Sequence, residues 1–265
     1  MHLDPVAHNA RVRIPDKAAY PPRGVPDGDA LEDATARALE RLAGLQQLLH
    51  ADGRYGMLVV LQGRDASGKD GVIRRVLGAC NPLGVRVAAF AAPTEDERQH
   101  DFLWRVHQQT PRRGQIGVFN RSHYEDVLVV RVRGLAPKKV WKARYDQINA
   151  FESTLTAAGI VVVKFFLHVS RAEQERRLLD RLDDPTEHWK FNRGDLAVRE
   201  RWDDYQAAYT EAIARTTTDE APWFVVPADR KWYRNWAVST ILVEALEALD
   251  PQFPVSDGLS DITVT

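Results

Sequence analysis

The sequence is poor in cysteine, in long apolar stretches and in net charge. Its single cysteine, Cys80, excludes an internal disulfide and a zinc site built from cysteines, which fits a reducing compartment such as the cytoplasm. No stretch is apolar for long enough to cross a bilayer, and the polar, proline-rich start lacks the apolar segment of a signal peptide. We therefore expect a cytoplasmic protein that has no membrane partner.

The chain also lacks an excess of either charge. Its 36 Lys and Arg residues nearly balance 37 Asp and Glu residues, which leaves a net charge of −1. No overall field attracts nucleic acid, so we expect no nucleic-acid partner, and any polyanion must be bound by a local cluster of basic residues. With 265 residues, 44% of them hydrophobic and 28% charged, the chain has the composition of a globular protein and not of a disordered or collagen-like one.

Short apolar runs alternate with helical patterns along most of the chain. Residues 1–30 mix proline, glycine and charge without a period, which predicts an N-terminal arm that crosses the surface, and helical spacing begins at Leu31. The capping-box pattern of a helix start begins at Thr94 and again at Ser170. The apolar runs predict strands at Met57–Leu61, Val85–Phe90, Ile116–Phe119, Ile160–Leu167 and Trp223–Val226.

Strands that alternate with amphipathic helices predict a parallel sheet covered on both faces. The sequence has no repeat or low-complexity tract, so we expect residues 31–265 to form a single three-layer α/β/α domain around a five-stranded parallel sheet. Ligands of such sheets bind beyond the carboxyl ends of the strands, where loops lead into helices. The polar motifs described next follow those strands.

A glycine-rich loop follows the first apolar run and precedes a helical stretch. Two glycines five positions apart, with Lys69 directly after the second, have the spacing of a phosphate-binding P-loop. Small residues let backbone amides converge on phosphate oxygens, and the lysine reaches the outer phosphate. The candidate phosphate-binding residues are Gly63, Arg64, Ala66, Ser67, Gly68, Lys69, Asp70 and Gly71.

Two carboxylates in this loop depart from the usual pattern. Asp70 stands where Ser or Thr normally supplies the hydroxyl that holds magnesium. It is either a magnesium ligand or an ordinary acid in the first turn of a helix, where the helix dipole favours it. Asp65 lies inside a loop that binds anions, and a carboxylate there repels phosphate unless a cation lies between them. We interpret Asp65 as the group that organises magnesium or, alternatively, as the base that readies an incoming phosphate oxygen.

A second polar loop follows the third predicted strand. P-loop enzymes commonly have a magnesium-binding carboxylate at this point, and here Asn120 takes that place, with Glu125 or Asp126 available to compensate. Arg121 is either a phosphate ligand beside Lys69 or a surface ion-pair partner, and we favour phosphate contact. Three histidines are expected to be structural and not catalytic: His123, and the pair His100 and His107, which we place on one helix face.

The helix after the fourth predicted strand presents basic residues. Arg177 and Arg181 lie one helical turn apart and share a face, although an ion pair between Glu173 and Arg177 is the structural alternative. Residues 183–200 form a polar, basic stretch with aromatic residues, and this stretch includes Lys190. In a P-loop kinase, such an insertion suits a lid that closes over phosphates and excludes water.

The predicted cations outnumber what the phosphates of one nucleotide require, so we expect a second polyanionic substrate. Two other functions are compatible with the same loops. The first is an ATP-dependent kinase of a nucleotide or small molecule, and the second is a nucleotide-binding module without turnover. The lid counts against the second, because a protein that only binds has no need to exclude water.

Seven motifs occur in order along the chain beyond the arm. They are Gly63–Gly71 (GRDASGKDG), His100–Arg105 (HDFLWR), Phe119–Val129 (FNRSHYEDVLV), His188–Asn192 (HWKFN), Trp202–Tyr205 (WDDY), Ala221–Trp223 (APW) and Pro227–Tyr233 (PADRKWY). In these motifs the chain resembles the polyphosphate kinase 2 family, P-loop phosphotransferases related to thymidylate kinase. The resemblance implies a thymidylate-kinase-like P-loop fold with a helical lid.

The resemblance also implies an activity and its cofactor. The reaction is reversible transfer of the terminal phosphate of inorganic polyphosphate to a nucleotide, with Mg²⁺ as cofactor and Mn²⁺ as an alternative. In the family, the P-loop acid and lysine match Asp65 and Lys69, and the arginines of the second loop and of the helix before the lid match Arg121 and Arg177. These four residues are therefore our candidate catalytic residues.

Two positions bear on the choice of nucleotide. Many family members have Asp where Asn120 stands, and Asn120 followed by an acid at Glu125 looks like the third class, which implies acceptance of AMP as well as ADP. Without the carboxylate at Asn120, Asp65 takes more of the metal-binding role. Adenine nucleotides are expected, with guanine nucleotides as an alternative. Seven Trp residues and the long arm would suit a homo-oligomer.

Overall fold

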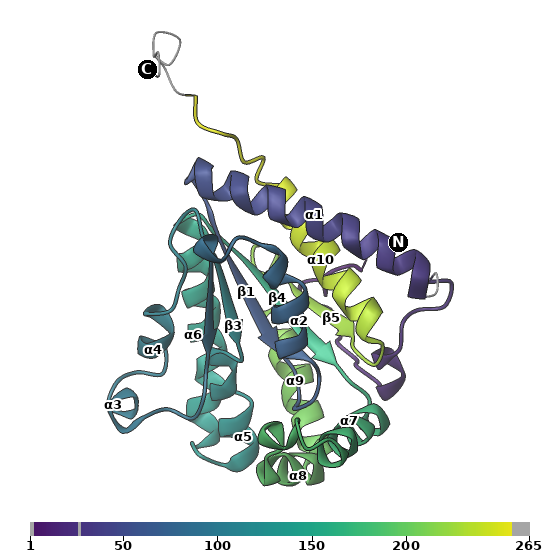
Figure 1. The fold of residues 1–265 in the computed structure, drawn as a ribbon. Coiled ribbons are helices and arrows are strands. Elements are labelled where there is room, and N and C mark those ends of the chain that lie inside the picture. The colour runs from purple at the N-terminus through teal and green to yellow at the C-terminus, as the bar shows by residue number, and fades with distance from the viewer. Residues whose placement is uncertain (1–2, 26–27, 256–265) are drawn as a thin grey trace.

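The five apolar runs of the sequence form one parallel sheet in the computed structural model, which describes residues 3–25 and 28–255 (Figure 1). The strands lie in the order β2-β3-β1-β4-β5, so β1 lies between β3 and β4. Each strand agrees with its predicted run to within one residue at either end. The strands are β1 Gly56–Gln62, β2 Val85–Ala89, β3 Ile116–Asn120, β4 Ile160–His168 and β5 Trp223–Pro227.

Helices fill the connections between the strands. Among the described residues, no helix combines the length and apolarity needed to cross a membrane. The α-helices are α1 Gly28–Asp52, α2 Lys69–Arg75, α3 Glu95–Arg98, α4 Trp104–His107, α5 Val129–Arg133, α6 Lys138–Ala157, α7 Arg171–Asp183, α8 Arg193–Glu200, α9 Trp202–Thr216 and α10 Lys231–Glu247. Short 3₁₀ turns are η1 Asp16–Ala19, η2 Leu77–Ala79, η3 Pro82–Gly84, η4 His123–Asp126 and η5 His188–Lys190.

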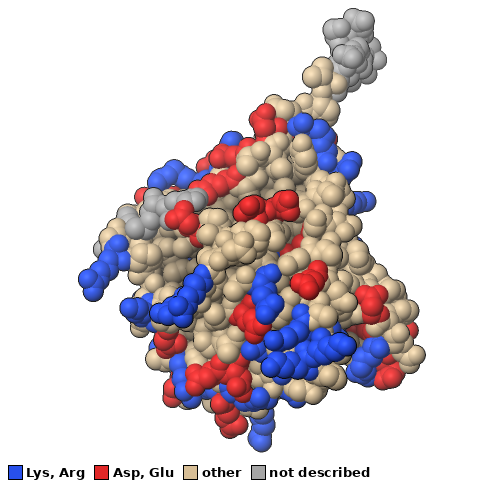
Figure 2. All heavy atoms as spheres, turned by 180° about the vertical axis from the view of Figure 1, so that it is seen from behind, with Lys and Arg blue, Asp and Glu red and all other residues tan. Residues whose placement is uncertain are grey.

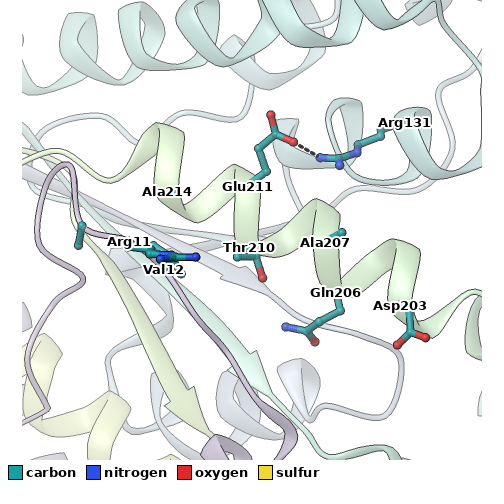
Figure 3. Close-up of a pocket in the computed structure, with 10 residues that line it drawn as sticks. Arg11, Val12, Arg131, Asp203, Gln206, Ala207, Thr210, Glu211 and Ala214 are labelled. Carbon is teal, nitrogen blue, oxygen red and sulfur yellow. Dashed lines mark hydrogen bonds and ion pairs between the residues drawn. The ribbon is translucent and has the colours of Figure 1, made fainter.

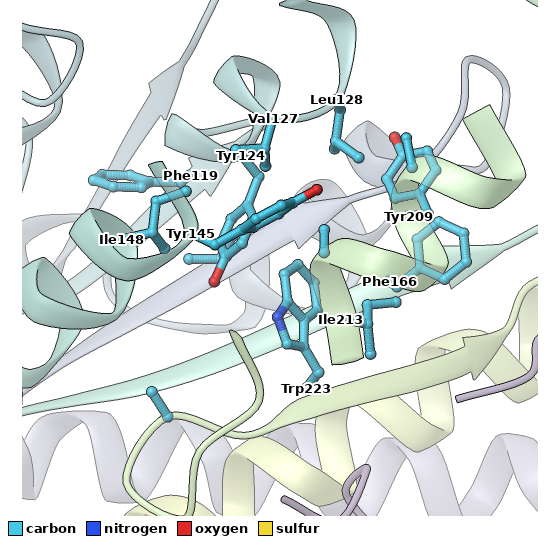
Figure 4. Packing of buried hydrophobic residues seen from close by; sticks show 14 of the residues in the cluster. Phe119, Tyr124, Val127, Leu128, Tyr145, Ile148, Phe166, Tyr209, Ile213 and Trp223 are labelled. Atoms are coloured by element: carbon cyan, nitrogen blue, oxygen red, sulfur yellow. The ribbon is translucent and has the colours of Figure 1, made fainter. Parts of the chain in front are cut away.

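Helices cover both faces of the sheet. On one face α1, α2 and α10 pack over the strands, with Leu42, Val72 and Ala237 in one apolar cluster. On the other face α6 and α9 pack over the strands, and Figure 4 shows Tyr145 of α6 and Ile213 of α9 in that second cluster. All seven residues of β1 are buried between these layers. The predicted three-layer α/β/α architecture is therefore confirmed.

The helix starts differ from the predictions in two details. The first helix begins at Gly28 and not at Leu31, so the last residues assigned to the arm are helical. The capping box at Thr94 is complete. At Ser170 only half of the box forms, because the side chain of Ser170 accepts from Glu173 N, whereas the Glu173 carboxylate binds arginine side chains.

The prediction that His100 and His107 share one helix face is wrong. The segment contains two short helices, α3 and α4, and His100 lies between them. The Asp101 side chain accepts a hydrogen bond from Leu103 N at 2.9 Å, which begins a new turn. His100 stacks on Trp104 instead, with ring centroids 4.0 Å apart.

The N-terminal segment before α1 lies along the β5 edge of the sheet. Val6 N donates to Trp223 O at 2.8 Å, and Asp229 N donates to Ala19 O at 3.1 Å. Ile14 and Ala19 of the arm are themselves buried. Because an open strand edge invites pairing with another chain, this cover protects the sheet at β5.

Candidate active site

The P-loop connects β1 to α2 at the carboxyl end of the strands, and α5, α7 and α8 lie around the same end of the sheet (Figure 1). Gly63 has φ +155°, and a Cβ there would lie 2.5 Å from Ser67 Oγ and 2.8 Å from Leu167 O. Gly68 has φ +100°, and a Cβ there would lie 1.8 Å from Arg234 Nη1. Both glycines are therefore required by backbone conformation and by close neighbours.

Lys69 is folded back onto the loop that it follows. Its Nζ donates to Gly63 O at 2.7 Å and to Arg64 O at 3.2 Å, and the side chain is buried. Burial, together with the nearby Arg121 guanidinium, lowers the pKa of Lys69 to about 8. Its two hydrogen bonds thus go to backbone carbonyls, and a phosphate oxygen would favour the charged form of the ammonium.

Arg121 joins the second polar loop to the P-loop. Its Nη2 donates to Asp65 Oδ1, and its Nη1 lies 3.7 Å from Glu125 Oε2. Burial works to lower the pKa of Arg121, but the carboxylates of Glu125 and Asp65 together raise it above its usual value. The backbone of Arg121 has φ +61°, a conformation that costs a residue with a side chain about 1–2 kcal/mol. The fold thus holds this guanidinium in place at the expense of local backbone strain.

The two positions that depart from the usual P-loop pattern are in contact. Asn120 Nδ2 donates to Asp70 Oδ1 at 2.7 Å. Of the two acids expected to compensate for Asn120, Asp126 faces away, because its Oδ1 accepts from Arg144 Nη1 of α6 at 2.9 Å. Burial raises the pKa of Asp126 to about 6. Glu125, beside Arg121, is therefore the acid that remains near the P-loop.

The Arg64 side chain points from the P-loop toward α9. Its guanidinium is buried and lies 3.9 Å from the ring of Trp202, and its Nη2 donates to Gln206 Oε1 at 2.8 Å. Gln206 Nε2 in turn donates to Ile14 O of the arm. The Arg64 side chain thus connects the P-loop to α9 and, through Gln206, to the arm.

Arg177 also supports the loop from behind. It is 7% exposed, and its Nη1 donates to Ala66 O at 2.9 Å while its Nη2 donates to Ala228 O at 2.6 Å. Its Nε donates to Glu173 Oε1 at 2.7 Å, so the ion pair named as the structural alternative is present. Its side chain thus links the P-loop carbonyl of Ala66 to the carbonyl of Ala228 after β5.

The stretch predicted as a lid is largely helical. It begins where α7 ends at Asp183 and includes η5 and α8. Asp195, in the first turn of α8, is nearly buried, and its Oδ2 lies 3.8 Å from Arg181 Nη1. Burial raises the pKa of Asp195 to about 6, and the Asp65 carboxylate adds to the rise. α8 thus brings a further acid toward the P-loop.

Lys190 lies in the same stretch but contacts its own neighbours. Its Nζ forms an ion pair with Glu187 at 2.5 Å and lies 5.1 Å from the centre of the Trp189 ring. Trp189 is 79% exposed. In this arrangement the basic and aromatic groups of η5 are held at the surface and not against the P-loop.

Sequence reasoning missed two supporting residues. Gln174 Nε2 donates to Asp65 O at 3.0 Å, and the buried Arg234 lies against Gly68. Both come from helices far from the P-loop in the sequence, so no local pattern points to them. Asp195 was missed as well, although its place in the predicted lid was a usable signal.

A buried polar network lies behind the second loop. Lys164 Nζ of β4 donates to Glu152 Oε2 at 2.5 Å and to Thr216 O at 2.6 Å. Tyr124 OH donates to Glu152 Oε1 at 2.8 Å, and His123 Nε2 lies 3.2 Å from the same oxygen. Burial lowers the pKa of His123. The network anchors the loop that carries Arg121.

The P-loop region fits a magnesium ion. Within residues 3–25 and 28–255, no group of three or more His, Cys, Asp or Glu side chains forms a metal cage. Magnesium does not need one, because it usually keeps several waters and binds one or two carboxylates together with substrate phosphates. Asp65 and the exposed Asp70 provide such carboxylates beside Lys69.

A separate hollow of about 660 Å³ lies between the arm and α9 (Figure 3). Its wall includes Arg11 and Val12 of the arm, and the ion pair between Arg131 and Glu211 spans one side. No P-loop residue lines it.

Figure 2 shows basic side chains interspersed with acidic ones on one face of the molecule, in keeping with the near-zero net charge.

A parallel sheet with a P-loop after its first strand, a polar loop after the neighbouring strand and a helical segment near both is the architecture of P-loop proteins that bind and transfer or hydrolyse nucleotide phosphates. Comparisons with known proteins narrow this class. The profile of the polyphosphate kinase 2 family, described as Polyphosphate kinase 2 (PPK2), matches residues 27–254. The chain belongs to this family, as its motifs led us to expect.

Individual relatives agree with this assignment. An AMP/ADP-polyphosphate phosphotransferase of Meiothermus ruber is 54% identical over 242 residues, which cover 89% of this chain and 91% of that protein. An ADP-polyphosphate phosphotransferase of Rhodopseudomonas palustris is 46% identical over 228 residues, or 82% of this chain and 79% of that protein. The crystal structure of Polyphosphate Kinase 2 from Arthrobacter aurescens TC1 matches with a TM-score of 0.83 and 43% identity, over 95% of each chain.

Proposed function

We propose that this protein transfers the terminal phosphoryl group of inorganic polyphosphate to ADP and AMP in a reversible reaction. The observation that carries the proposal is the contact between the two loops, in which Arg121 reaches Asp65 beside Lys69, in a chain of the polyphosphate kinase 2 family. The activities of the relatives from Meiothermus ruber and Rhodopseudomonas palustris support AMP and ADP as acceptors.

The proposed mechanism is alignment of two phosphate chains followed by in-line transfer, without a covalent enzyme intermediate. The backbone of Gly63–Gly68 and the Lys69 ammonium would bind phosphate oxygens, and Arg121 would neutralise charge that develops on the transferred group. Asp65 and Asp70 would hold Mg²⁺, or Mn²⁺ in its place, and the ion would supply charge neutralisation between the two chains. Arg64 and Arg177 would keep the loop in shape.

The segment between α7 and α9 would close over the phosphates. Arg181 and Lys190 would then meet the polyphosphate, once released from Asp195 and Glu187. Closure would exclude water, which competes as phosphoryl acceptor. Asn120 and Glu125 would face the nucleotide, with adenine as the base and guanine as an alternative. We also propose a cytoplasmic location and assembly into a homo-oligomer.

Phosphoryl transfer can be tested with purified protein, Mg²⁺ and either AMP or ADP as acceptor. Long-chain polyphosphate is the donor in one set of reactions and ATP replaces it, with AMP as acceptor, in a parallel set; products are separated by anion-exchange chromatography. We expect ADP and ATP to form from polyphosphate. Product in the ATP reactions but not in the polyphosphate reactions would instead favour the ATP-dependent kinase. Nucleotide binding without product in either set would favour the module without turnover.

Variants of the loop serve as internal controls of the same assay. Lys69→Ala and Asp65→Asn should each reduce turnover by about two orders of magnitude or more, the scale of losing a preorganised charge. Normal turnover of Asp65→Asn would contradict the metal role of Asp65.

A further inference from the structure

Asp70 and Asn120 are the two residues of the loops that depart from the P-loop pattern at metal-binding positions. In P-loop enzymes, a Ser or Thr hydroxyl follows the lysine and a carboxylate lies at the end of a neighbouring strand, and both hold magnesium. Here the carboxylate follows the lysine, at Asp70, and an amide ends the strand, at Asn120. Taken singly, each substitution weakens the usual arrangement.

The structure shows that the two departures are physically linked. Asn120 Nδ2 donates to Asp70 Oδ1 at 2.7 Å, a short hydrogen bond of the kind that a charged acceptor forms. Asn120 is the last residue of β3 and is in register with Leu61 of β1, whereas Asp70 is the second residue of α2. The contact therefore joins the start of the P-loop helix to the neighbouring strand.

We propose that Asp70 and Asn120 act as one unit in which the donor and the carboxylate of the usual metal-binding pair have exchanged places. The unit keeps one negative charge and one hydrogen bond between the two elements. It leaves the second carboxylate oxygen of Asp70 and the amide oxygen of Asn120 for a hydrated magnesium ion. The proposal rests on the phosphotransferase function proposed above, and it assigns to Asp70 the ligand role and not merely that of a first-turn helix acid.

If the two residues act as one unit, the two single variants should change the affinity for a divalent cation in opposite directions. Asn120→Asp places two carboxylates a hydrogen-bond distance apart, so they repel when no cation is present and bind a divalent cation more strongly. Asp70→Asn leaves two amides and no charge, so binding of a divalent cation weakens. Each variant should lose about tenfold or more in kcat/KM, the scale of coupling between residues in direct contact.

The double variant Asp70→Asn/Asn120→Asp tests directly whether the two residues act as one unit. It exchanges the two groups without changing the shape or charge of the pair. We expect its kcat/KM to exceed that of either single variant by about tenfold. Thermal unfolding provides a readout that does not depend on activity, measured for all four proteins in EDTA and again with Mn²⁺ alone. In EDTA the midpoint of Asn120→Asp should fall, and the double variant should return to the wild-type value. The midpoint gained with Mn²⁺ should be larger than wild type for Asn120→Asp, smaller for Asp70→Asn and near wild type for the double variant.

The matched control is Asp29→Asn, which removes an exposed acid from the first turn of α1. It should leave the Mn²⁺ response and kcat/KM unchanged. The proposal is overturned if Asp70→Asn behaves like this control. It is also overturned if, in the double variant, the changes in kcat/KM and in the EDTA midpoint equal the sums of the changes in the two single variants. If polyphosphate is no substrate for any of the proteins while the unfolding data show coupling, the proposed function fails and the pairing stands.

Discussion

Lys69 is buried, and burial disfavours the charged form of its side chain. Burial lowers its pKa to about 8 from an ordinary value of 10.5, and the side chain donates hydrogen bonds to two backbone carbonyls. A phosphate oxygen in their place would favour the ammonium and raise the pKa again. Ligand binding is therefore coupled to the charge of a single side chain.

We predict that phosphate binding takes up protons at alkaline pH. At pH 8.5 a substantial fraction of free Lys69 is neutral, so binding of ADP or polyphosphate should take up part of a proton, whereas at pH 6.5 Lys69 is already charged and contributes no uptake. Isothermal titration calorimetry in buffers of different ionisation enthalpy measures this number. Lys69→Arg stays charged at both pH values and should show no uptake at pH 8.5. An equal uptake in this variant would contradict the assignment to Lys69.

Arg177 gives a second prediction, in which stability separates a positioning role from a surface role. Arg177→Ala removes donors to Ala66 O and Ala228 O and leaves Glu173 with one arginine partner fewer. Loss of these buried hydrogen bonds should cost about 2–4 kcal/mol in the free energy of unfolding, measured by urea denaturation. Arg181→Ala, one turn along the same helix, should cost less than about 1 kcal/mol. Equal losses of stability in both variants would contradict the positioning role of Arg177.

The residues of the site could be predicted from the sequence only in part. Lys69, Asp65 and Arg121 stand in local motifs, and a parallel sheet brings the ends of neighbouring strands together, so their proximity was predictable. The partners of Arg64 and Arg177 were not, because they are ring faces and carbonyls that lie more than a hundred residues away in the chain. Local patterns hold no information on such contacts.

At the scale of elements, buried strands were the most predictable part. A central parallel strand is covered on both faces, so it appears as an uninterrupted apolar run, as in β1. Short helices were less predictable, because a single side chain such as Asp101 ends one turn and begins another. The arm was predicted to cross the surface, but its place along β5 depends on backbone hydrogen bonds that no side-chain pattern encodes.

We predict that the arm stabilises the sheet. Deleting residues 1–19 exposes the site of the buried Ile14 and removes acceptors from Asp229 N and Gln206. Burial of one aliphatic side chain and two hydrogen bonds contribute about 3 kcal/mol together, so the unfolding midpoint should fall by several degrees. The uncovered β5 edge should also promote association, visible by light scattering. Arg11→Ala in the exposed part of the arm is the control and should change neither quantity; an unchanged midpoint in the deletion variant would show that the arm adds nothing to stability.

At the scale of the whole molecule, a few buried charged residues connect the loops at the carboxyl end of the sheet to its core. Lys164 lies within the apolar run of β4, where a lysine is itself a sequence signal of a buried partner. Its partner Glu152 belongs to α6, and the same carboxylate accepts from Tyr124, just beyond Arg121. The chain is almost neutral overall, so it has no strong overall electrostatic field. The positions and partners of individual charged groups, as in this network, therefore determine the local electrostatic potential.

The last prediction concerns this buried ion pair. Lys164→Met leaves the Glu152 carboxylate buried without its ammonium, which should destabilise the protein by about 3–5 kcal/mol. The double variant Glu152→Gln/Lys164→Met removes both charges, so its loss in urea denaturation should be smaller than that of Lys164→Met alone. Because the network anchors the loop that holds Arg121, kcat should also fall in Lys164→Met under conditions in which the variant remains folded, and part of it should return in the double variant. A double variant that is less stable than Lys164→Met would show that Glu152 is held by Tyr124 and His123 and does not depend on Lys164.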